Sequence, residues 1–209
     1  MFERINAGDG VFVYLAELPG CYGEGFIEDN FRRLPGFRQE ACRRYKHATG
    51  RRACIISWLL LSEGLREQYG VADPGEFIYN GYGKPYLKEY PHIFFNMSHC
   101  KSAVCCALAG FEIGVDVQDI RPYKAAVAKR VCSPAELRAL SAAADPARLF
   151  SKMWAKKESY AKARGISVTS VFKQDLPETG FISWEKENFW LLLKLCDPTV
   201  AKQDLGCRI

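Results

Sequence analysis

The chain has 209 residues, of which 48% are apolar and 25% are charged. This composition is typical of a folded globular protein and argues against a disordered or collagen-like chain. A chain of this length can bury on the order of 70% of the surface that it exposes when unfolded, so its core needs no disulfide scaffold. We expect one large domain or two small ones.

The nine cysteines are odd in number and no two form a CxxC pair, which gives no support to a zinc ribbon or a thioredoxin-type site. We expect reduced thiols. The amino terminus lacks the basic start and the continuous apolar core of a secretory leader. The longest apolar run, Cys54 to Leu61, is far shorter than the roughly 20 residues of a membrane span. These features predict a cytoplasmic protein.

The formal net charge of +5 is unevenly distributed. Residues 32–52 carry eight Arg or Lys and only one acid, and residues 121–173 carry twelve against three acids. Such basic segments favour surfaces that meet an anion, such as a phosphate, a nucleic acid or an acidic protein. Solvated helix faces explain the charges equally well, so the charge pattern alone does not decide between them.

In the first half of the chain, the residue pattern predicts strands around a long helix. An alternating apolar run predicts a strand over 10–18, and a helical pattern begins near Leu34. Mixed three- and four-residue spacings predict a buried helix over 49–70 that ends at Gly70. Turns at residues 80–81 and 83–85 follow. Three short β-prone runs come next and are expected to be adjacent strands: 93–97, 103–108 and 111–117.

The second half contains the clearest helix signals. Ser133 to Glu136 reads as a capping box with proline at the first helical position, and a short helix should follow to about Ala143. A second helix is predicted over 147–165, with Gly165 at its C-cap. The runs 181–184 and 189–195, separated by polar residues, predict a hairpin.

Strands and a helix thus occur twice. This pattern favours an α+β architecture of two similar-sized halves, residues 1–110 and 111–209, with the boundary near Gly110.

One candidate site lies on the predicted helix 147–165. Trp154, Glu158 and Lys162 follow one another at four-residue intervals, so one helix face holds an acid beside a base. Lys157 lies about 100° around the helix, on an adjoining surface. The alternative is an exposed Glu158–Lys162 ion pair beside a packing tryptophan, worth roughly a few tenths of a kcal/mol.

The third β-prone run carries a second group of polar residues. Asp116 and Gln118 share one side of the strand, whereas Val115 and Val117 face the packed side. A carboxylate in an apolar run is costly to bury unless it is paired or bound to a cation. Together with Glu158, these oxygens offer Mg²⁺ a partial shell that water and phosphate complete. A strand-end aspartate that caps a turn is the alternative.

Both candidate sites match one family pattern. The 4′-phosphopantetheinyl transferases of the larger, surfactin-synthetase-activating (Sfp) type carry (I/V)G(I/V)D, a gap of about forty residues, and WxxKExxxK. The chain resembles this signature at IGVDVQ (113–118) and FSKMWAKKESYAK (150–162). It also resembles the family's GKP turn at YGKPYL (82–87), its FNxSHS segment at FFNMSHC (94–100), and its early basic region at CRRY (42–45) with Arg52.

The resemblance implies an enzyme that moves the phosphopantetheine arm of coenzyme A onto a serine of an acyl or peptidyl carrier protein and releases adenosine 3′,5′-bisphosphate. Asp116 and Glu158 would hold Mg²⁺ against the diphosphate, with Gln118 as a further metal ligand. Glu158, directly or through a water molecule, would take the serine proton, and Lys162 would neutralise or protonate the leaving group. These three charged residues are the expected catalytic residues.

The resemblance also implies which residues contact coenzyme A. We expect Lys157 to contact its phosphates. Six further residues match family positions near the adenosine, the 3′-phosphate and the diphosphate: Arg38, Arg52, Lys84, Pro85, Ser98 and His99. Arg51 is an alternative to Arg52, and a lone histidine such as His99 is often only a hydrogen-bonding residue. Gln118 departs from the family pattern, in which a glutamate often stands at this position, so we expect weaker Mg²⁺ binding or a water bridge, with Mn²⁺ able to substitute.

The implied partner is an acidic carrier protein, which Lys124, Lys129 and Arg130 of the basic segment could steer. The family's pseudodimer, with its active site between the two halves, needs no second chain, so we expect a monomer without nucleic-acid or membrane partners. The rival readings are a metal-dependent nuclease and a basic nucleic-acid binder with interleaved aromatic residues such as Tyr45 and Tyr160. Neither rival explains the order of the four motifs.

Overall fold

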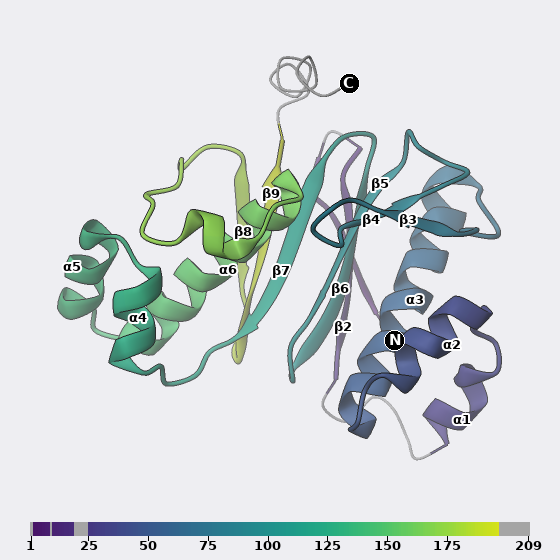
Figure 1. The fold of residues 1–209 in the computed structure, drawn as a ribbon, viewed down its shortest axis with the longest axis horizontal. Helices are drawn as coiled ribbons and strands as arrows, with labels where there is room; N and C mark the ends of the chain where they lie inside the picture. Colours follow the sequence, from purple (N-terminus) through teal and green to yellow (C-terminus); the bar gives the residue numbers. More distant parts are fainter. Residues whose placement is uncertain (1, 9, 19–24, 197–209) are drawn as a thin grey trace.

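The computed structural model describes residues 2–8, 10–18 and 25–196. Four layers lie side by side in it (Figure 1): the long helix α3 (Ala48–Tyr69), two antiparallel sheets, and a second long helix, α6 (Pro146–Arg164). The shorter helices flank these layers, two on the α3 side and the others on the α6 side (Figure 1). They are α1 (Phe26–Phe31), α2 (Gly36–Arg43), α4 (Ala125–Val131), α5 (Pro134–Ala142) and the 3₁₀ turn η1 (Val168–Val171).

Within the described residues, seven strands form the two sheets. The sheet beside α3 contains, in spatial order, β1 (Glu3–Asn6), β2 (Phe12–Glu17), β6 (Ala103–Ala109) and β5 (Phe94–His99). The sheet beside α6 contains, in spatial order, β7 (Ile113–Asp119), β9 (Phe189–Leu195) and β8 (Phe181–Glu185). A separate hairpin pairs β3 (Phe77–Tyr79) with β4 (Pro85–Leu87). The turn between β6 and β7 carries the chain from one sheet to the other.

Alternation along the strands decides which layer each side chain enters. In β2, Tyr14 packs toward α3, while Val13 and Leu15 enter the apolar core between the two sheets. Val115 and Val117 of β7 enter the same core, which confirms their predicted packing. The opposite face of β7 therefore turns toward α6.

The helix ends follow the predicted signals. Gly70 and Gly165 end α3 and α6 in the left-handed conformation, with φ of +66° and +61°. The capping box at the start of α5 is confirmed: the Glu136 amide donates to the Ser133 hydroxyl (3.1 Å), and the Ser133 amide donates to the Glu136 carboxylate (2.8 Å). The predicted hairpin over 181–195 is confirmed as β8 and β9.

One expectation about the strands is wrong. The three central β-prone runs are not neighbours in one sheet, because β5 pairs with β6 whereas β7 pairs with β9. Both edges of β6 are already occupied, by β2 and β5, so β7 packs against the buried face of β6 instead. The sequence pattern also missed β1, α1, α4 and the β3–β4 hairpin, which are all short.

No helix in the described part of the chain is long and apolar enough to cross a membrane. The seven cysteines within the described residues are all free, in agreement with the expected reduced thiols. Cys21 and Cys207 lie outside the described residues.

Candidate active site between β7 and α6

The site is built where α6 crosses β7. At Gly114 the two backbones meet so closely that a Cβ atom would overlap the Ser159 carbonyl oxygen and the Ala163 amide, and would lie 2.9 Å from the Ala163 Cα. Only glycine permits this approach. Since Asp116 is two residues further along the same face of β7, the crossing brings it against the Glu158 and Lys162 turns of α6.

Asp116 and Lys162 form the centre of the site. The Lys162 ammonium lies 2.6 Å from Oδ1 of Asp116 and also donates to the Ser98 hydroxyl (2.9 Å) and the Val115 carbonyl (3.3 Å). The Ser98 hydroxyl in turn donates to Asp116 Oδ1 (2.7 Å). The structure thus brings three predicted site residues together, and Lys162 pairs with a strand carboxylate in addition to facing its helix neighbour Glu158.

The second carboxylate oxygen of Asp116 is buried and has no hydrogen-bond partner among the described residues. Asp116 as a whole is only 4% exposed. A buried carboxylate oxygen without a donor is energetically costly, so this atom is positioned to accept a ligand that the protein itself does not supply.

Asp116 also lines a cavity of about 390 Å³. Besides apolar atoms, its walls contain six of the predicted residues: Ser98, His99, Asp116, Gln118, Glu158 and Lys162. Trp154 also lines it, so the predicted helix face with Trp154, Glu158 and Lys162 points into one cavity. Asp116 and Gln118 share this cavity, as their spacing predicts.

The charges of the cavity perturb one another. Burial raises the pKa of Glu158, and the Asp116 charge adds to this rise while the Lys162 charge opposes it. Burial alone would lower the pKa of Lys162, but the charge and hydrogen bond of Asp116 outweigh burial, so the pKa of Lys162 is raised. Burial, assisted by the Lys162 charge, lowers the pKa of His99. Lys162 therefore stays protonated, and His99 is mainly neutral at pH 7.

Three contacts from the first half of the chain hold β7 in place, and the sequence did not reveal their roles. Asn96 accepts a hydrogen bond from the Val115 amide (2.9 Å). The Asp119 carboxylate accepts from the Lys101 and Ser102 amides (3.1 and 3.2 Å) and so caps the turn that follows His99. Asn96 lies inside the FNMSH motif, and this motif is the one feature of the sequence that could have indicated a role for Asn96.

Lys84, which was expected to bind coenzyme A, is not among the residues that line this cavity. Its side chain is 5% exposed, forms an ion pair with Glu112, and donates to the Ile113 and Ala163 carbonyls (both 3.1 Å). Asn80 of the same turn donates to the Gly165 carbonyl (2.9 Å). The GKP turn is therefore hydrogen-bonded both to the end of α6 and to the start of β7. Pro85, the next residue, lies in β4 and is paired with Tyr79 of β3.

Lys157, which was expected to contact the coenzyme phosphates, is buried on the far side of α6 in the structure. Its side chain is 0% exposed, lies 3.0 Å from the Glu136 carboxylate, and donates to the Gln174 carbonyl (2.7 Å). Lys157 is rotated by about 100° around α6 from Glu158. Its side chain therefore lies between α6, α5 and the segment that follows η1.

Arg38 and Arg52 lie in α2 and α3, outside the residues that line the cavity. The Arg38 guanidinium donates to the Cys54 carbonyl (3.1 Å) and lies 5.8 Å from the Trp58 ring centre. The Nε atoms of Arg38 and Arg52 are buried without a partner among the described residues. Tyr45, in the loop between these helices, makes an edge contact with His99 (6.1 Å between ring centres) and so connects this region to the cavity.

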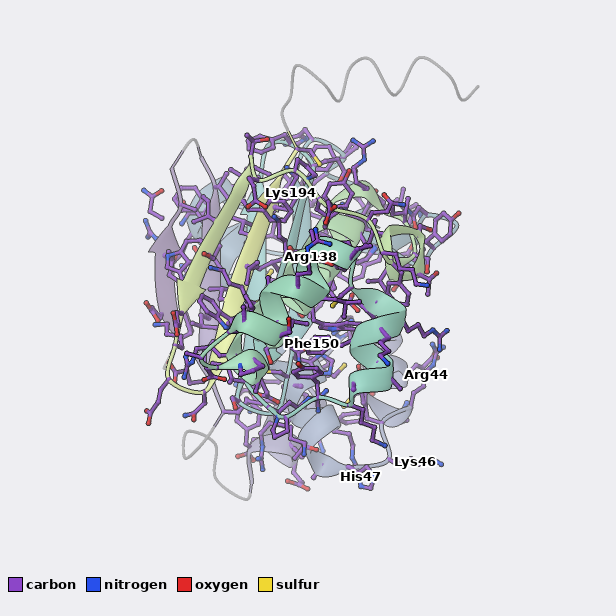
Figure 2. All side chains as sticks on the ribbon, turned by 90° about the vertical axis from the view of Figure 1, so that its left-hand side faces the viewer. Arg44, Lys46, His47, Arg138, Phe150 and Lys194 are labelled. Atoms are coloured by element: carbon purple, nitrogen blue, oxygen red, sulfur yellow. The ribbon has the colours of Figure 1, made fainter. Side chains whose placement is uncertain are left out.

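More basic side chains occupy the same loop. Arg44, Lys46 and His47 are all exposed and lie together at one edge of the molecule (Figure 2). The loop within the basic segment 32–52 is therefore an exposed basic surface around Tyr45.

Comparison with known proteins agrees with this site. Residues 112–201 match the model of the 4′-phosphopantetheinyl transferase superfamily. The chain is 31% identical to a 4′-phosphopantetheinyl transferase of Bacillus subtilis and 30% identical to the transferase Sfp of B. subtilis strain 168, in each case over 71% of the chain and 69% of the relative. It is 28% identical to the transferase HetI of a Nostoc strain, over 93% and 89%. The chain therefore belongs to the 4′-phosphopantetheinyl transferase superfamily.

Proposed function

We propose that this chain transfers 4′-phosphopantetheine from coenzyme A to a serine hydroxyl of an acyl or peptidyl carrier protein and releases adenosine 3′,5′-bisphosphate. The observation that carries the proposal is Asp116, which has one buried, partnerless carboxylate oxygen and lines one cavity with Glu158 and Lys162. Two acids and a cation around an accessible cavity suit a reaction at a diphosphate.

The oxygen donors of the cavity fit Mg²⁺. Asp116, Gln118 and Glu158 would hold the ion, and the unpaired Asp116 oxygen is the donor that most needs it. No group of three or more His, Cys, Asp or Glu side chains in the described ranges could hold a metal by itself. This agrees with Mg²⁺, which typically takes one or two carboxylates and completes its shell with water and substrate phosphates. When bound, the ion would stabilise negative charge on the diphosphate oxygens.

The chain's own residues would carry the proton and the charge. The carrier serine oxygen forms a bond to the phosphorus next to pantetheine, while the bond from that phosphorus to the oxygen bridging the two phosphates breaks. Glu158 accepts the serine proton, since its carboxylate lines the cavity in which the diphosphate would bind. The departing bisphosphate takes the electron pair of the broken bond.

Lys162 would neutralise the leaving group as a fixed cation. Because the pKa of Lys162 is raised, it keeps its proton near neutral pH and serves better as a charge than as a proton donor. Ser98 fixes the position of Lys162 through a 2.9 Å hydrogen bond.

The nucleotide end of coenzyme A would lie on the α2 side of the cavity. His99 lines the cavity and contacts Tyr45, and the exposed basic loop that begins at Arg44 continues in this direction. Arg38 and Arg52, with Arg51 as an alternative, remain candidates for the 3′-phosphate. The buried Nε atoms of Arg38 and Arg52 are still without partners in the described part of the chain.

The two halves, 1–110 and 111–209, would form an intramolecular pseudodimer with the active site between them. Each half contributes an antiparallel sheet covered by a long helix, and the two sheets share one apolar core, which supports this organisation. Such a chain would act as a monomer.

An acidic carrier protein would approach the basic α4 region. Lys124, Lys129 and Arg130 are exposed there. Charge steering of this kind is screened by salt, so we expect association with the carrier to slow about tenfold at high salt while coenzyme binding is kept. Carrier kinetics that do not respond to salt would refute the steering.

The intact mass of apo carrier proteins incubated with coenzyme A and Mg²⁺ tests the function. We expect a mass gain of one phosphopantetheine with the native chain, no gain with Asp116→Ala, and a normal gain with the control Asp73→Ala, which alters an exposed loop acid. The function would be refuted if the native chain modified no acyl or peptidyl carrier, or if Asp116→Ala were fully active.

A further inference from the structure

Strands β5 and β7 lie side by side at the site although they belong to different sheets. Side chains join them: Asn96 accepts from the Val115 amide (2.9 Å), and Ser98 donates to Asp116 (2.7 Å). These contacts advance in the same direction along both strands, so the two strands run parallel. The boundary between them divides the cavity, because Ser98 and His99 come from β5 and Asp116 comes from β7.

Asp119, the last residue of β7, makes a further contact across this boundary. Its two carboxylate oxygens accept from the amides of Lys101 (3.1 Å) and Ser102 (3.2 Å), in the short turn between β5 and β6. Burial alone would raise the pKa of Asp119, but hydrogen bonds from the side chains of Cys100 and Ser102 outweigh burial, and the pKa is lowered. One carboxylate therefore binds every residue of the turn that follows His99.

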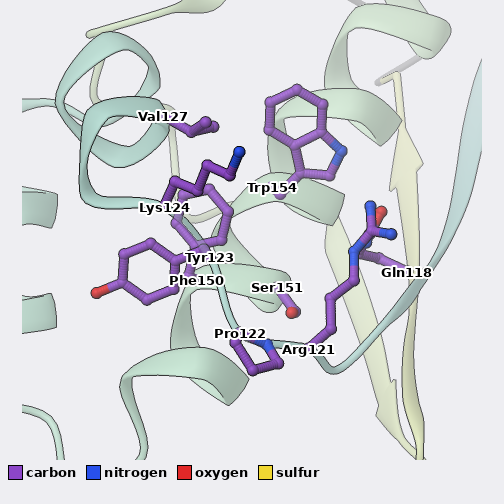
Figure 3. A pocket seen from close by; sticks show the side chains of 9 residues that line it. All are labelled: Gln118, Arg121, Pro122, Tyr123, Lys124, Val127, Phe150, Ser151 and Trp154. Atoms are coloured by element: carbon purple, nitrogen blue, oxygen red, sulfur yellow. The ribbon is translucent and has the colours of Figure 1, made fainter.

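Alternation along β7 explains why Asp119 reaches this turn. Gln118 lines a pocket with Trp154 of α6 (Figure 3), so the neighbouring Asp119 points to the other face of the strand, as Val117 does. That face meets the sheet that contains β5 and β6. Asp119 is not among the residues that line the cavity, and both of its oxygens already accept hydrogen bonds. Asp119 is therefore no candidate for a metal ligand.

The turn depends on Asp119 more than β7 does. Strand β7 is paired with β9 along its whole length, from Ile113 to Asp119. The turn, in contrast, projects beyond the last pair of β5 and β6, which joins His99 to Val104, and Lys101 in it is exposed. Loss of the Asp119 carboxylate would thus release the end of the β5–β6 hairpin from β7, and His99 is the cavity residue at this end.

We infer that Asp119 is a positioning residue, which holds the turn 100–102 against β7 and so fixes His99 beside the cavity oxygens of Asp116 and Gln118. The inference rests on the proposed function and adds to it a residue that contacts neither the substrate nor the metal. A hairpin end free to move would place His99 correctly in only a fraction of the molecules. The apparent Kd for coenzyme A rises as this fraction falls.

A direct effect of the Asp119 charge on Mg²⁺ is the rival explanation, because Asp119 is next to Gln118 in the chain. The two explanations differ for Asp119→Asn. This variant loses the charge but keeps one oxygen that can accept from a turn amide. Positioning therefore predicts a smaller effect for Asp119→Asn than for Asp119→Ala, whereas a charge effect predicts the same result for both.

Calorimetric titration of the full chain with coenzyme A at saturating Mg²⁺, below the Tm of every variant, tests the inference. We expect Asp119→Ala to raise the Kd about tenfold, since the release misplaces a binding group by a fraction of the 1 Å that can cost 100-fold. Asp119→Asn should raise the Kd less. The matched control is Asp73→Ala, which removes a carboxylate that accepts from the Gly75 amide (3.0 Å) in another turn, and it should bind as the native chain does.

The double variant His99→Ala with Asp119→Ala identifies the residue through which Asp119 acts. If Asp119 acts through His99, the double variant should bind coenzyme A as His99→Ala alone does, within about twofold, because the two changes then remove the same interaction. Independent residues would instead multiply their effects. A loss of stability alone would lower the Tm without this coupling between the two Kd values.

Four outcomes overturn the inference. They are an unchanged Kd in Asp119→Ala, multiplied effects in the double variant, equal effects of Asp119→Asn and Asp119→Ala, and a shift in the Mg²⁺ concentration for half-maximal activity with no change in Kd. If Asp119→Ala does not fold, an unchanged Kd in Asp119→Asn overturns it as well. Failure of the proposed function is distinct, because the native chain would then not bind coenzyme A and would modify no carrier.

Discussion

Replacing Gly114 by alanine should disable the site without touching any catalytic side chain. The new Cβ would overlap two backbone atoms of α6 and lie 2.9 Å from the Ala163 Cα, where Cβ contacts ordinarily begin at 3.4 Å. Backbone atoms cannot turn aside as side chains do, so α6 must move by on the order of 1 Å. Overpacking of this kind costs about 1–3 kcal/mol, and each kcal/mol lowers the Tm of a chain this long by roughly 2–4 °C.

The larger effect should be on turnover. Glu158 and Lys162 lie on the displaced helix and Asp116 does not, and a misplacement of about 1 Å can cost on the order of 100-fold in rate. The assay is the initial rate of carrier modification, measured by intact mass below the Tm of the variant. Gly110→Ala is the matched control, because a Cβ there meets nothing within 4 Å. If Gly114→Ala lowered the Tm but kept the native rate, the crossing would not position the catalytic residues, and the reasoning would be refuted.

Four further variants have distinct expected results. Glu158→Gln should abolish transfer yet raise the Tm at pH 7, because the pKa of Glu158 is raised in the folded chain and its ionised carboxylate therefore destabilises the fold above that pKa. The gain in Tm should vanish near pH 4, where the carboxyl group is protonated in both the folded and the unfolded chain. A Tm equal to that of the native chain at both pH 7 and pH 4 would contradict this expectation. Lys84→Met should lower the Tm and the rate of transfer but leave the Kd for coenzyme A unchanged, because Lys84 donates to the Ile113 and Ala163 carbonyls. A higher Kd would show instead that Lys84 contacts coenzyme A. Gln118→Glu should reach half-maximal activity at a lower Mg²⁺ concentration than the native chain. The same half-maximal concentration in both proteins would show that Gln118 does not weaken Mg²⁺ binding. Lys157→Met should lose about 1–3 kcal/mol in denaturant unfolding because it removes the cation beside the partly buried Glu136 carboxylate, and Lys157→Met with Glu136→Gln should recover part of this.

The residues that the sequence predicted well are those whose position depends on local geometry. Asp116 and Gln118 follow from period two in a strand, and Glu158 and Lys162 follow from a four-residue spacing on a helix. Each pattern also allowed a purely structural interpretation, and only the packing of α6 on β7 brings the two pairs into one cavity. Gly114 makes that packing possible, yet in the sequence it is simply a glycine in a strand.

The contacts that the sequence did not predict join distant segments of the chain. Lys84 lies in the GKP turn, and its ammonium donates to the Ile113 and Ala163 carbonyls, 29 and 79 residues away. Lys157 is likewise captured by Glu136, from a helix whose packing against α6 no local pattern predicts. The sequence alone does not distinguish a solvent-exposed lysine from a lysine whose ammonium is buried in contacts between distant segments.

The order of the sheets was hidden for a similar reason. The runs that became β6 and β7 are both apolar and are separated by a short turn at Gly110, which is also the pattern of a hairpin. Pairing is decided by which strand edges are free, and β2, from the start of the chain, occupies the edge of β6 that β7 would have needed.

The most direct test is an anomalous difference map from crystals of the full chain grown with Mn²⁺ and coenzyme A. We expect a single strong manganese peak in the cavity between β7 and α6, within coordination distance of Asp116 and Glu158 and next to the diphosphate. A diphosphate bound elsewhere, or a manganese ion in contact with neither carboxylate, would contradict it.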